Sequence, residues 1–309
     1  MKVVAGGVEV ADPAGAAAAA VVAGERAAKR RRVAAEPAPA GVRRNGGGGG
    51  VGRRERRRRV QADAAAVQRL FQACRDVFRG PGTVPKPDEV HMLRAMLDRM
   101  KPEDVGLSPD LKFFRNRDAA QGTPTITHTT IYKCPNFSMV ILFLPRNAVI
   151  PLHNHPGMTV FSKLLLGSMH IKSYDWVDPD SDSSSVSSSS SSDDEQLRLA
   201  KLVVDDDFTA PCDTSVLYPT TGGNMHRFTA ITPCAIIDIL GPPYSIEEDR
   251  DCTYYTDIPY TLHSTADNPS DLNNIEQDHG CLAWLKEIDM PRELKMCSVH
   301  YGGPPISDK

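Results

Sequence analysis

The sequence predicts an all-β domain, a barrel or sandwich, preceded by two helices. Between residues 125 and 240, short apolar and β-branched segments recur at close spacing with turn-forming residues between them, a pattern typical of all-β folds. Ahead of them, two segments repeat apolar residues at the i, i+3, i+4 spacing of an amphipathic helix. Apolar residues make up 40% of the chain, which is enough for a sizeable core.

The two predicted helices follow each other in the sequence. The first ends at Gly80-Pro81, and its apolar positions are Val67, Leu70, Phe71, Cys74, Val77 and Phe78. The second spans Asp88 to Met100 and follows Pro87, a residue favoured in the first turn of a helix. We expect both helices to pack on the outside of the barrel.

The predicted strands begin with Thr125–Lys133, which alternates and is rich in β-branched residues, and Phe137–Leu144, which is almost entirely apolar. The others are Val149–His155, Met158–Leu166, Ser168–Trp176, Leu199–Asp205, Ser215–Tyr218, His226–Thr232 and Ala235–Leu240. After Asp251, the sequence predicts a polar stretch and then a short helix around Cys281 to Ile288, which contains Trp284.

The domain boundaries follow from composition. Residues 1–60 are rich in Ala, Gly, Pro and Arg and lack an apolar period, so we expect a disordered basic tail. Residues 61–303 form the predicted globular domain, and residues 304–309 form a C-terminal tail. Within the domain, the Ser/Asp tract of residues 178–195 has almost nothing to bury, so we expect a disordered loop.

Charge is divided unevenly between the tail and the domain. Residues 1–60 carry 14 Lys/Arg and 5 Asp/Glu, a net charge of +9 against −3 overall, so the remainder carries −12. The basic clusters Lys29–Arg32 and Arg53–Arg59 are either a nuclear import signal or a solvated tail, and we expect the protein in the nucleus and the cytoplasm. No aromatic or recognition-helix pattern accompanies them, which argues against sequence-specific nucleic-acid binding.

Neither a membrane segment nor a disulfide framework is predicted. The longest strongly apolar run, Met139–Leu144, is too short to cross a bilayer. The 7 cysteines are scattered without a CxxC pair, so we expect reduced, intracellular thiols. Nothing in the sequence demands association, and we expect a monomer.

Three histidines form a candidate metal site. His153 and His155 lie two apart in an extended segment, where side chains at i and i+2 share one face, so both imidazoles can reach one ion. His226 follows Gly222-Gly223 at the start of another predicted strand. Imidazole is a common ligand of zinc, copper, iron and nickel. We therefore favour metal binding over a coincidence of three ordinary polar residues.

The identity of the metal stays open from the residues alone. No acidic residue lies within the dozen positions after His155, so the carboxylate that often joins two histidines in nonheme iron oxygenases has no candidate there. Three histidines also suit a hydrolytic zinc ion, whereas O2 chemistry requires a redox metal. His128 and His170 have no partner at ligand spacing, and we expect both to be ordinary polar residues.

Asp238 is unusual because it interrupts the apolar strand Ala235–Leu240 and shares a face with Ile236 and Leu240. Burying a carboxylate costs several kcal/mol unless it is paired, so the position needs a reason. One reason is a buried structural hydrogen bond. The other is a role in orienting a substrate or in moving protons.

Three segments occur in order along the chain: HNHPGMTVFSKLLLGSMHIKSYDW, LYPTTGGNMHRFTA and AIIDILGPPYS, the last followed by DRDCTYY. Together they resemble the plant cysteine oxidases, relatives of animal aminoethanethiol dioxygenase. The resemblance runs from about Val67 to Gly303 and leaves out the basic tail. It implies a cupin-type β-barrel, or jelly roll, in which His153, His155 and His226 hold Fe(2+).

The resemblance also implies roles for further residues and an activity. Asp238 and Tyr244 would line the substrate pocket as catalytic and substrate-binding residues, and Cys252 and Tyr254 would be ordinary residues near it. The enzyme would use O2 to oxidise the N-terminal cysteine of proteins, such as group VII ethylene response factors, to cysteine sulfinic acid. That product would prime arginylation and degradation by the N-degron pathway. The enzyme would thus sense oxygen in the hypoxia response.

Two alternatives remain beside this expectation. A dioxygenase of the same chemistry would oxidise small thiols such as cysteamine or free cysteine. A cupin without catalysis would bind a metal and use the basic tail for interactions in the nucleus. A zinc hydrolase is disfavoured, because no nucleophile or obvious general base accompanies the histidines.

Overall fold

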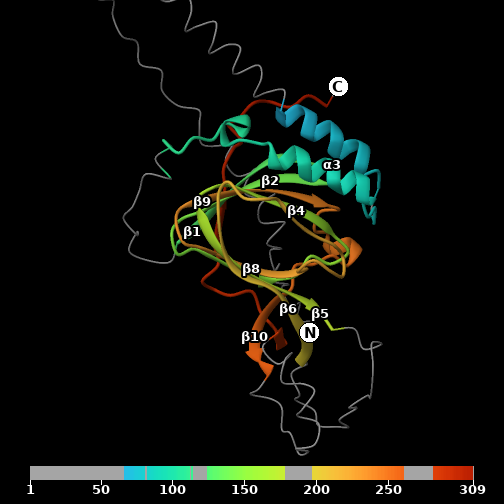
Figure 1. Ribbon diagram of the computed structural model, residues 1–309, viewed down its shortest axis with the longest axis vertical. Coiled ribbons are helices and arrows are strands. Elements are labelled where there is room, and N and C mark those ends of the chain that lie inside the picture. Colours follow the sequence, from blue (N-terminus) through green and yellow to red (C-terminus); the bar gives the residue numbers. More distant parts are fainter. Residues whose placement is uncertain are drawn as a thin grey trace, which may run out of the picture.

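Two helices and two β-sheets make up most of the chain that the computed structural model describes (Figure 1). The described residues are 66–80, 82–111, 113, 124–177, 197–260 and 281–308. Two predictions lie outside these residues: the basic tail of residues 1–60 with its import signal, and the loop of residues 178–195.

Both helices form where the apolar spacing predicted them, over residues 66–77 and in α3 (Pro87–Asp98). They lie side by side on one face of the sheet that contains β2 (Ser138–Leu144) and β4 (Thr159–Leu166) (Figure 1). The ring of Phe71 packs against that of Tyr132 at 4.6 Å between centroids. Burial of this apolar stripe fixes the helices on the outside of the sheet.

The sheet beneath the helices has six strands in the order β12-β1-β2-β9-β4-β7. Its remaining strands are β1 (Thr125–Lys133), β7 (Ser215–Leu217), β9 (Cys234–Gly241) and β12 (Lys295–Ser298), which runs parallel to β1. Every residue of β9 is buried. Ile237 and Ile239 pack towards the helices, whereas Ile236 belongs to the cluster between the two sheets. This strand is therefore covered on both faces.

The second sheet closes on itself in the order β10-β11-β6-β5-β8-β3, with β10 paired to β3. Its strands are β3 (Val149–His153), β5 (Ser168–Trp176), β6 (Leu197–Thr209), β8 (Met225–Ala230), β10 (Tyr254–Pro259) and β11 (Leu282–Ile288). Short 3-10 turns occupy Pro102–Val105 and Ile246–Glu248. This sheet lies across from the first (Figure 1), and the two form the predicted jelly roll of the cupin type.

The helix predicted around Cys281 to Ile288 is wrong, because this segment is strand β11. Ala283 and Leu285 are buried while Trp284 lies on the other face, which is the alternation of a strand. Both edges of β11 are paired, with β10 on one side and β6 on the other. The neighbouring strands cannot be inferred from a short apolar run alone. The local pattern of such a run therefore fits a helix as well as a strand.

The residues expected to form a C-terminal tail lie along the first helix. Gln68 Nε2 donates to Ser307 O at 2.9 Å, and Ser307 N donates to Gln68 Oε1 at 2.7 Å. Asp308 forms an ion pair with Arg75 at 2.6 Å. These contacts connect the end of the described chain to its beginning.

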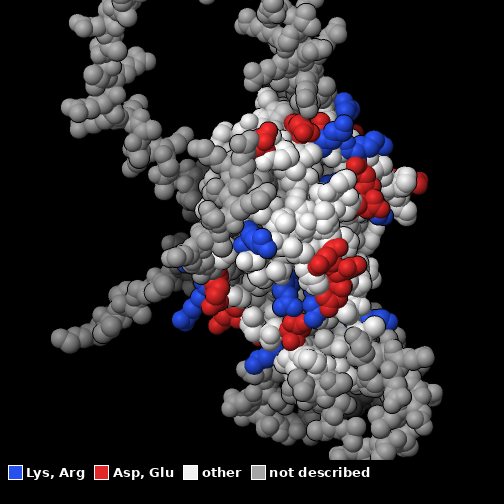
Figure 2. All heavy atoms as spheres, turned by 60° about the vertical axis from the view of Figure 1, so that its left-hand side comes forward, with Lys and Arg blue, Asp and Glu red and all other residues white. Residues whose placement is uncertain are grey.

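On the face seen in Figure 2, the Lys and Arg side chains of the described residues are interspersed with Asp and Glu. No helix among the described residues is long and apolar enough to cross a membrane.

Candidate metal centre

The structure brings His153, His155 and His226 together. His153 ends β3 and pairs directly with His226 of β8, and His155 follows two residues later in the turn after β3. Their candidate ligand nitrogens all lie within 4.8 Å of one another. His155 Nε2 lies 3.0 Å from His226 Nε2. All three residues are buried, so the predicted cluster forms inside the jelly roll.

Two of the imidazoles are fixed in one orientation by a hydrogen bond from the other ring nitrogen. His153 Nδ1 lies 2.8 Å from Pro151 O and donates to it. The Tyr244 hydroxyl donates to Asn154 O at 2.8 Å, so it accepts from His155 Nδ1 at 2.9 Å. In each ring the Nε2 lone pair is then free for a metal.

Burial keeps the cluster neutral. It lowers the pKa of His155 and His226 well below 6.5, and the neighbouring imidazoles lower both further. Burial also lowers the pKa of His153. The His155 and His226 Nε2 atoms, 3.0 Å apart, share a hydrogen bond whose donor depends on the tautomer, and a bound cation would replace that proton. The donor set and its protonation thus fit a divalent metal ion.

Asn224 and Asp175 hold the turn that carries His155, and the sequence analysis missed both. Asn224 Oδ1 accepts from His155 N at 3.1 Å, and Asn224 Nδ2 donates to His155 O at 2.9 Å. Asp175 Oδ1 accepts from the backbone of Gly223 and Asn224, both at 2.9 Å. The only sign of Asn224 in the sequence is its position as a polar residue between the glycine pair and His226.

Gly223 is required in this arrangement for a steric reason. Its φ of +82° lies in the left-handed region, and a Cβ there would come within 2.5 Å of Ser173 Oγ. Ser173 pairs with His226 across β5 and β8. A side chain at Gly223 would therefore push β5 away from the strand that carries a metal ligand.

Asp238 faces the interior between the sheets, as the period of two predicted. Its neighbours across the sheet are Val140 on β2 and Ser162 on β4. The residue is 8% exposed, and its Oδ1 is buried without a hydrogen-bond partner among the described residues. Burial raises the pKa of Asp238 to about 7, opposed by a hydrogen bond from Ser162. This carboxyl can therefore hold or release a proton near neutral pH.

Tyr244 connects the histidine cluster to the segment that follows β9. Its ring lies 5.4 Å from that of His155 between centroids. Burial raises the pKa of Tyr244 well above 10, and Cys252, Tyr254 and Asp238 raise it further. Hydrogen bonding of Cys252 to both tyrosines raises their pKa values. The residues expected near the pocket thus form one neighbourhood beside the cluster.

The two other histidines singled out from the sequence lie outside the cluster. His128 is half-buried in β1, where burial lowers its pKa. His170 lies between two carboxylates, with Asp207 at 2.7 Å and Asp205 at 2.8 Å from its ring nitrogens. Hydrogen bonds to these carboxylates raise the pKa of His170. Neither residue belongs to the group of candidate ligands found among the described residues.

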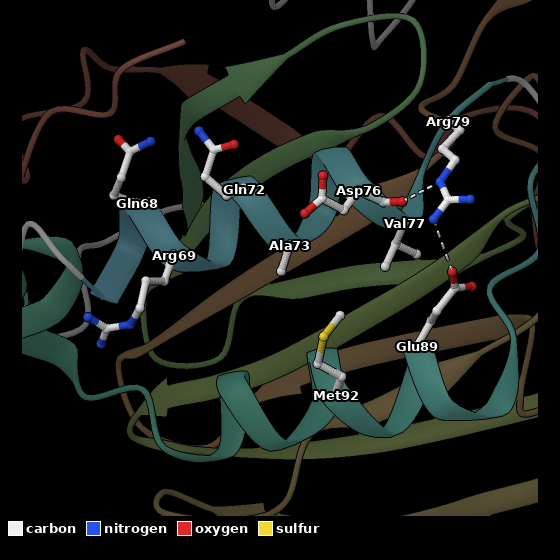
Figure 3. A pocket seen from close by; sticks show the side chains of 9 residues that line it. All are labelled: Gln68, Arg69, Gln72, Ala73, Asp76, Val77, Arg79, Glu89 and Met92. Atoms are coloured by element: carbon white, nitrogen blue, oxygen red, sulfur yellow. Dashed lines mark hydrogen bonds and ion pairs between the residues drawn. The ribbon is translucent and has the colours of Figure 1, made fainter. Parts of the chain in front are cut away.

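A groove of about 430 Å³ lies between the helix of residues 66–77 and α3 (Figure 3). Arg79 closes one end, where its Nε donates to Asp76 O at 2.6 Å and its guanidinium lies 3.8 Å from Glu89. No histidine or cysteine lines this groove. A smaller cavity of about 80 Å³ does include His226 in its lining, so the smaller space belongs to the candidate centre.

Comparison with known proteins adds a family context to this geometry. The sequence model of the PCO_ADO family matches residues 96–306. Plant cysteine oxidase 1 of Arabidopsis thaliana is 49% identical over 79% of this chain and 81% of its own length. The 2-aminoethanethiol dioxygenase of Mus musculus is 29% identical over 79% of this chain and 97% of its own. An RmlC-like cupin structure from Desulfovibrio desulfuricans is 15% identical over 38% of this chain and 84% of that one, with a TM-score of 0.25.

Proposed function

The chain belongs to the PCO_ADO family, and from this premise we propose that it is an iron(II)-dependent thiol dioxygenase that acts on the N-terminal cysteine of proteins. The single observation that carries the proposal is the cluster of three buried, neutral histidines with no acidic member. Relatives named as plant cysteine oxidase and as 2-aminoethanethiol dioxygenase support the reaction class.

The reaction class of the relatives supports iron over zinc. Relatives named as dioxygenases consume O2, which requires a redox metal, whereas zinc has no redox chemistry. Three histidine ligands would leave further positions of an iron ion open for substrates.

An iron(II) ion held by His153, His155 and His226 would supply the redox capacity that O2 chemistry needs and a positive charge that favours thiolate over thiol. Asp238 would accept the thiol proton or orient the substrate amine, because its pKa of about 7 suits proton exchange. Tyr244 would keep the His155 ring in place through the hydrogen bond to Nδ1. Burial of these groups would exclude bulk water from the reacting sulfur.

The proposed reaction balances without another reductant. The thiol loses its proton, both atoms of O2 end on the sulfur, and the product is the sulfinate. Sulfur is oxidised while O2 is reduced, so thiol and O2 are the only substrates. We propose ethylene response factors with an exposed N-terminal cysteine as targets, with the sulfinate leading to arginylation and N-degron degradation. Because O2 is consumed, the rate would follow oxygen supply in hypoxia.

A peptide assay tests this proposal directly. The purified, iron-loaded protein is given an N-terminal Cys-Gly-Gly peptide, and mass spectrometry looks for the added mass of one O2. An otherwise identical peptide with an acetylated N-terminus is the control, because it keeps the thiol and lacks the free amine. Oxidation of the free peptide alone supports the proposal. Absence of any thiol oxidation by the iron-loaded protein would refute it.

A dioxygenase of small thiols is the second candidate. The Mus musculus relative is named for 2-aminoethanethiol, which carries an amine and a thiol at the same spacing as an N-terminal cysteine. Cysteamine and free cysteine in the same assay separate the two candidates. A much higher kcat/KM for a small thiol than for the peptide would favour this second function.

Location and partners complete the proposal. The basic clusters Lys29–Arg32 and Arg53–Arg59 support entry into the nucleus as well as a cytoplasmic pool. We propose a monomer without a sequence-specific nucleic-acid partner. A reporter fused to residues 1–60 tests the location, and a reporter that stays out of the nucleus would contradict it.

A further inference from the structure

The cavity of about 80 Å³ beside His226 lies between the two sheets. Its lining comes from β4, β7 and β9 of the first sheet, from β5, β6 and β8 of the second, and from the segments that join β6 to β7 and β7 to β8. Ser173 and His226 are paired across β5 and β8, and both line the cavity. The cavity therefore reaches the histidine cluster from the side of β5 and β6.

Beyond His226, the walls of the cavity are mostly apolar. Phe228 follows His226 along the same face of β8, with its ring 4.3 Å from the imidazole between centroids. Five further apolar residues line the cavity and either belong to the hydrophobic cluster between the sheets or pack against it. They are Leu164, Met169, Ile171, Phe208 and Ile236. Polar residues also line the cavity, among them Ser162, Ser173 and the exposed Asp213 and Ser215. The apolar part of such a space can bind small apolar molecules such as xenon.

The polar side chains that could bind the thiol and the amine of a substrate lie elsewhere around the histidine cluster. Asp238, Tyr244 and Cys252 do not line this cavity. Tyr244 instead contacts His155 through Nδ1, while His226 faces the apolar space. Asp238 and Tyr244 thus lie outside a cavity whose lining is mainly apolar, although Asp213 and Ser162, the hydrogen-bond partner of Asp238, also line it.

We propose that this cavity is the O2 site of the protein, a store and entry route that delivers the gas to the His226 side of the cluster. The inference rests on the proposed function and adds where one of its two substrates binds. O2 is small and apolar, so it partitions from water into apolar surroundings. A peptide is too large for this space, and a thiolate or ammonium group would lose its hydration there. Separate approaches would keep the gas from competing with the peptide.

Xenon binding tests the site without any activity. Crystals of the full chain pressurised with xenon should show the gas between Ile171 and His226. Ile171 is partly buried and faces the cavity, so Ile171→Phe should fill the space and abolish the xenon signal. An empty cavity in pressurised wild-type crystals would overturn the proposal.

Steady-state kinetics test the route. Ile171→Phe should raise the apparent KM for O2 several-fold, while the KM for the thiol peptide and the kcat at saturating O2 stay unchanged. Leu142→Phe is the matched control, because Leu142 packs on the same apolar cluster without lining the cavity. If Ile171→Phe does not fold, Phe208→Trp fills the space from β6 and carries the same expectations.

The outcomes separate the two proposals. An unchanged KM for O2 in a folded variant that no longer binds xenon would overturn the O2 route while leaving thiol oxidation intact. An iron-loaded wild-type protein that oxidises no thiol would refute the proposed function, and the O2 route with it. The xenon experiment would still decide whether the cavity takes an apolar gas.

Discussion

The side-chain amide of Asn224 and the backbone of His155 form a reciprocal pair of hydrogen bonds. Asn224 Oδ1 accepts from His155 N at 3.1 Å, and Asn224 Nδ2 donates to His155 O at 2.9 Å. Both residues are buried. A ligand of the candidate metal centre is therefore held through its main chain by a residue 69 positions away.

Replacing Asn224 should weaken both the fold and the metal site. Asn224→Ala leaves the buried His155 N–H and the Tyr218 carbonyl without their Asn224 partner, while the His155 carbonyl keeps its hydrogen bond from Met158 N at 3.2 Å. Unpaired buried groups of this kind cost about 1–3 kcal/mol each. We expect a lower free energy of unfolding in urea and weaker iron binding. Gln72→Ala, an amide on the helix of residues 66–77, is the control, and equal behaviour of the two variants would contradict the account.

Removing the Tyr244 hydroxyl should reduce metal affinity without unfolding the protein. Tyr244→Phe deletes the group that accepts from His155 Nδ1 at 2.9 Å. Loss of such a partner of a metal-bound histidine lowers affinity by about 10–100-fold. Competition with a chelator measures the affinity. Tyr301→Phe is the control, because the Tyr301 hydroxyl is buried without a partner among the described residues, and it should bind iron like the wild type.

Asp238 should make the stability of the metal-free protein depend on pH. Its folded pKa of about 7 lies above the ordinary value of 3.8. Between these pH values the folded state holds a proton that the unfolded state has released, so the contribution of Asp238 to stability falls as pH rises. The whole loss is on the order of 4 kcal/mol, of which about 3 kcal/mol falls between about pH 5 and about pH 8. The three buried histidines, whose pKa values are lowered, change stability in the opposite direction over this range. Unfolding in urea at the two pH values is therefore compared between the wild type and Asp238→Asn.

Asp238→Asn should remove the contribution of Asp238, because the amide does not ionise, and should leave the opposite contribution of the three buried histidines. If the wild type and the variant lose the same stability between the two pH values, the carboxyl is not the cause. The variant should also keep its iron and lose turnover of the thiol peptide, since Asp238 is not in the ligand cluster. Full activity in the variant would remove Asp238 from the proposed chemistry.

His226→Ala should lose bound iron and thiol oxidation together, because two imidazoles alone cannot complete the cluster. Metal analysis and the peptide assay on one preparation check this expectation. His91→Ala, an exposed position on α3, is the control and should behave like the wild type. Turnover that persists in a variant free of iron would reject the site assignment.

Much of the metal centre could be predicted because its determinants are local. His153 and His155 share a face through the period of two in an extended segment, and the same period predicted the interior position of Asp238. The third histidine of the cluster follows a glycine pair in a strand-like segment, which is a local pattern as well. Each of these inferences needs only a few neighbouring residues.

The parts that could not be predicted depend on contacts between distant segments. Asn224 and Asp175 form hydrogen bonds with residues 48 to 69 positions away. The place of Asn224 after the glycine pair is a weak local sign, and no local pattern marks Asp175. Leu282–Ile288 was expected to be helical because its short apolar run has no decisive period, and its pairing with β6 and β10 determines the strand. Long-range pairing of this kind overrides local propensity.

The most direct measurement compares one metal-free preparation after anaerobic loading with iron(II), with zinc, or with buffer alone. Each sample then receives an N-terminal-cysteine peptide and O2, and the sulfinate is quantified by mass. The account predicts one iron bound per chain, sulfinate formation that follows the iron content, and no product with zinc or with buffer. Sulfinate formed after complete removal of iron, or equally by the zinc-loaded protein, would contradict it.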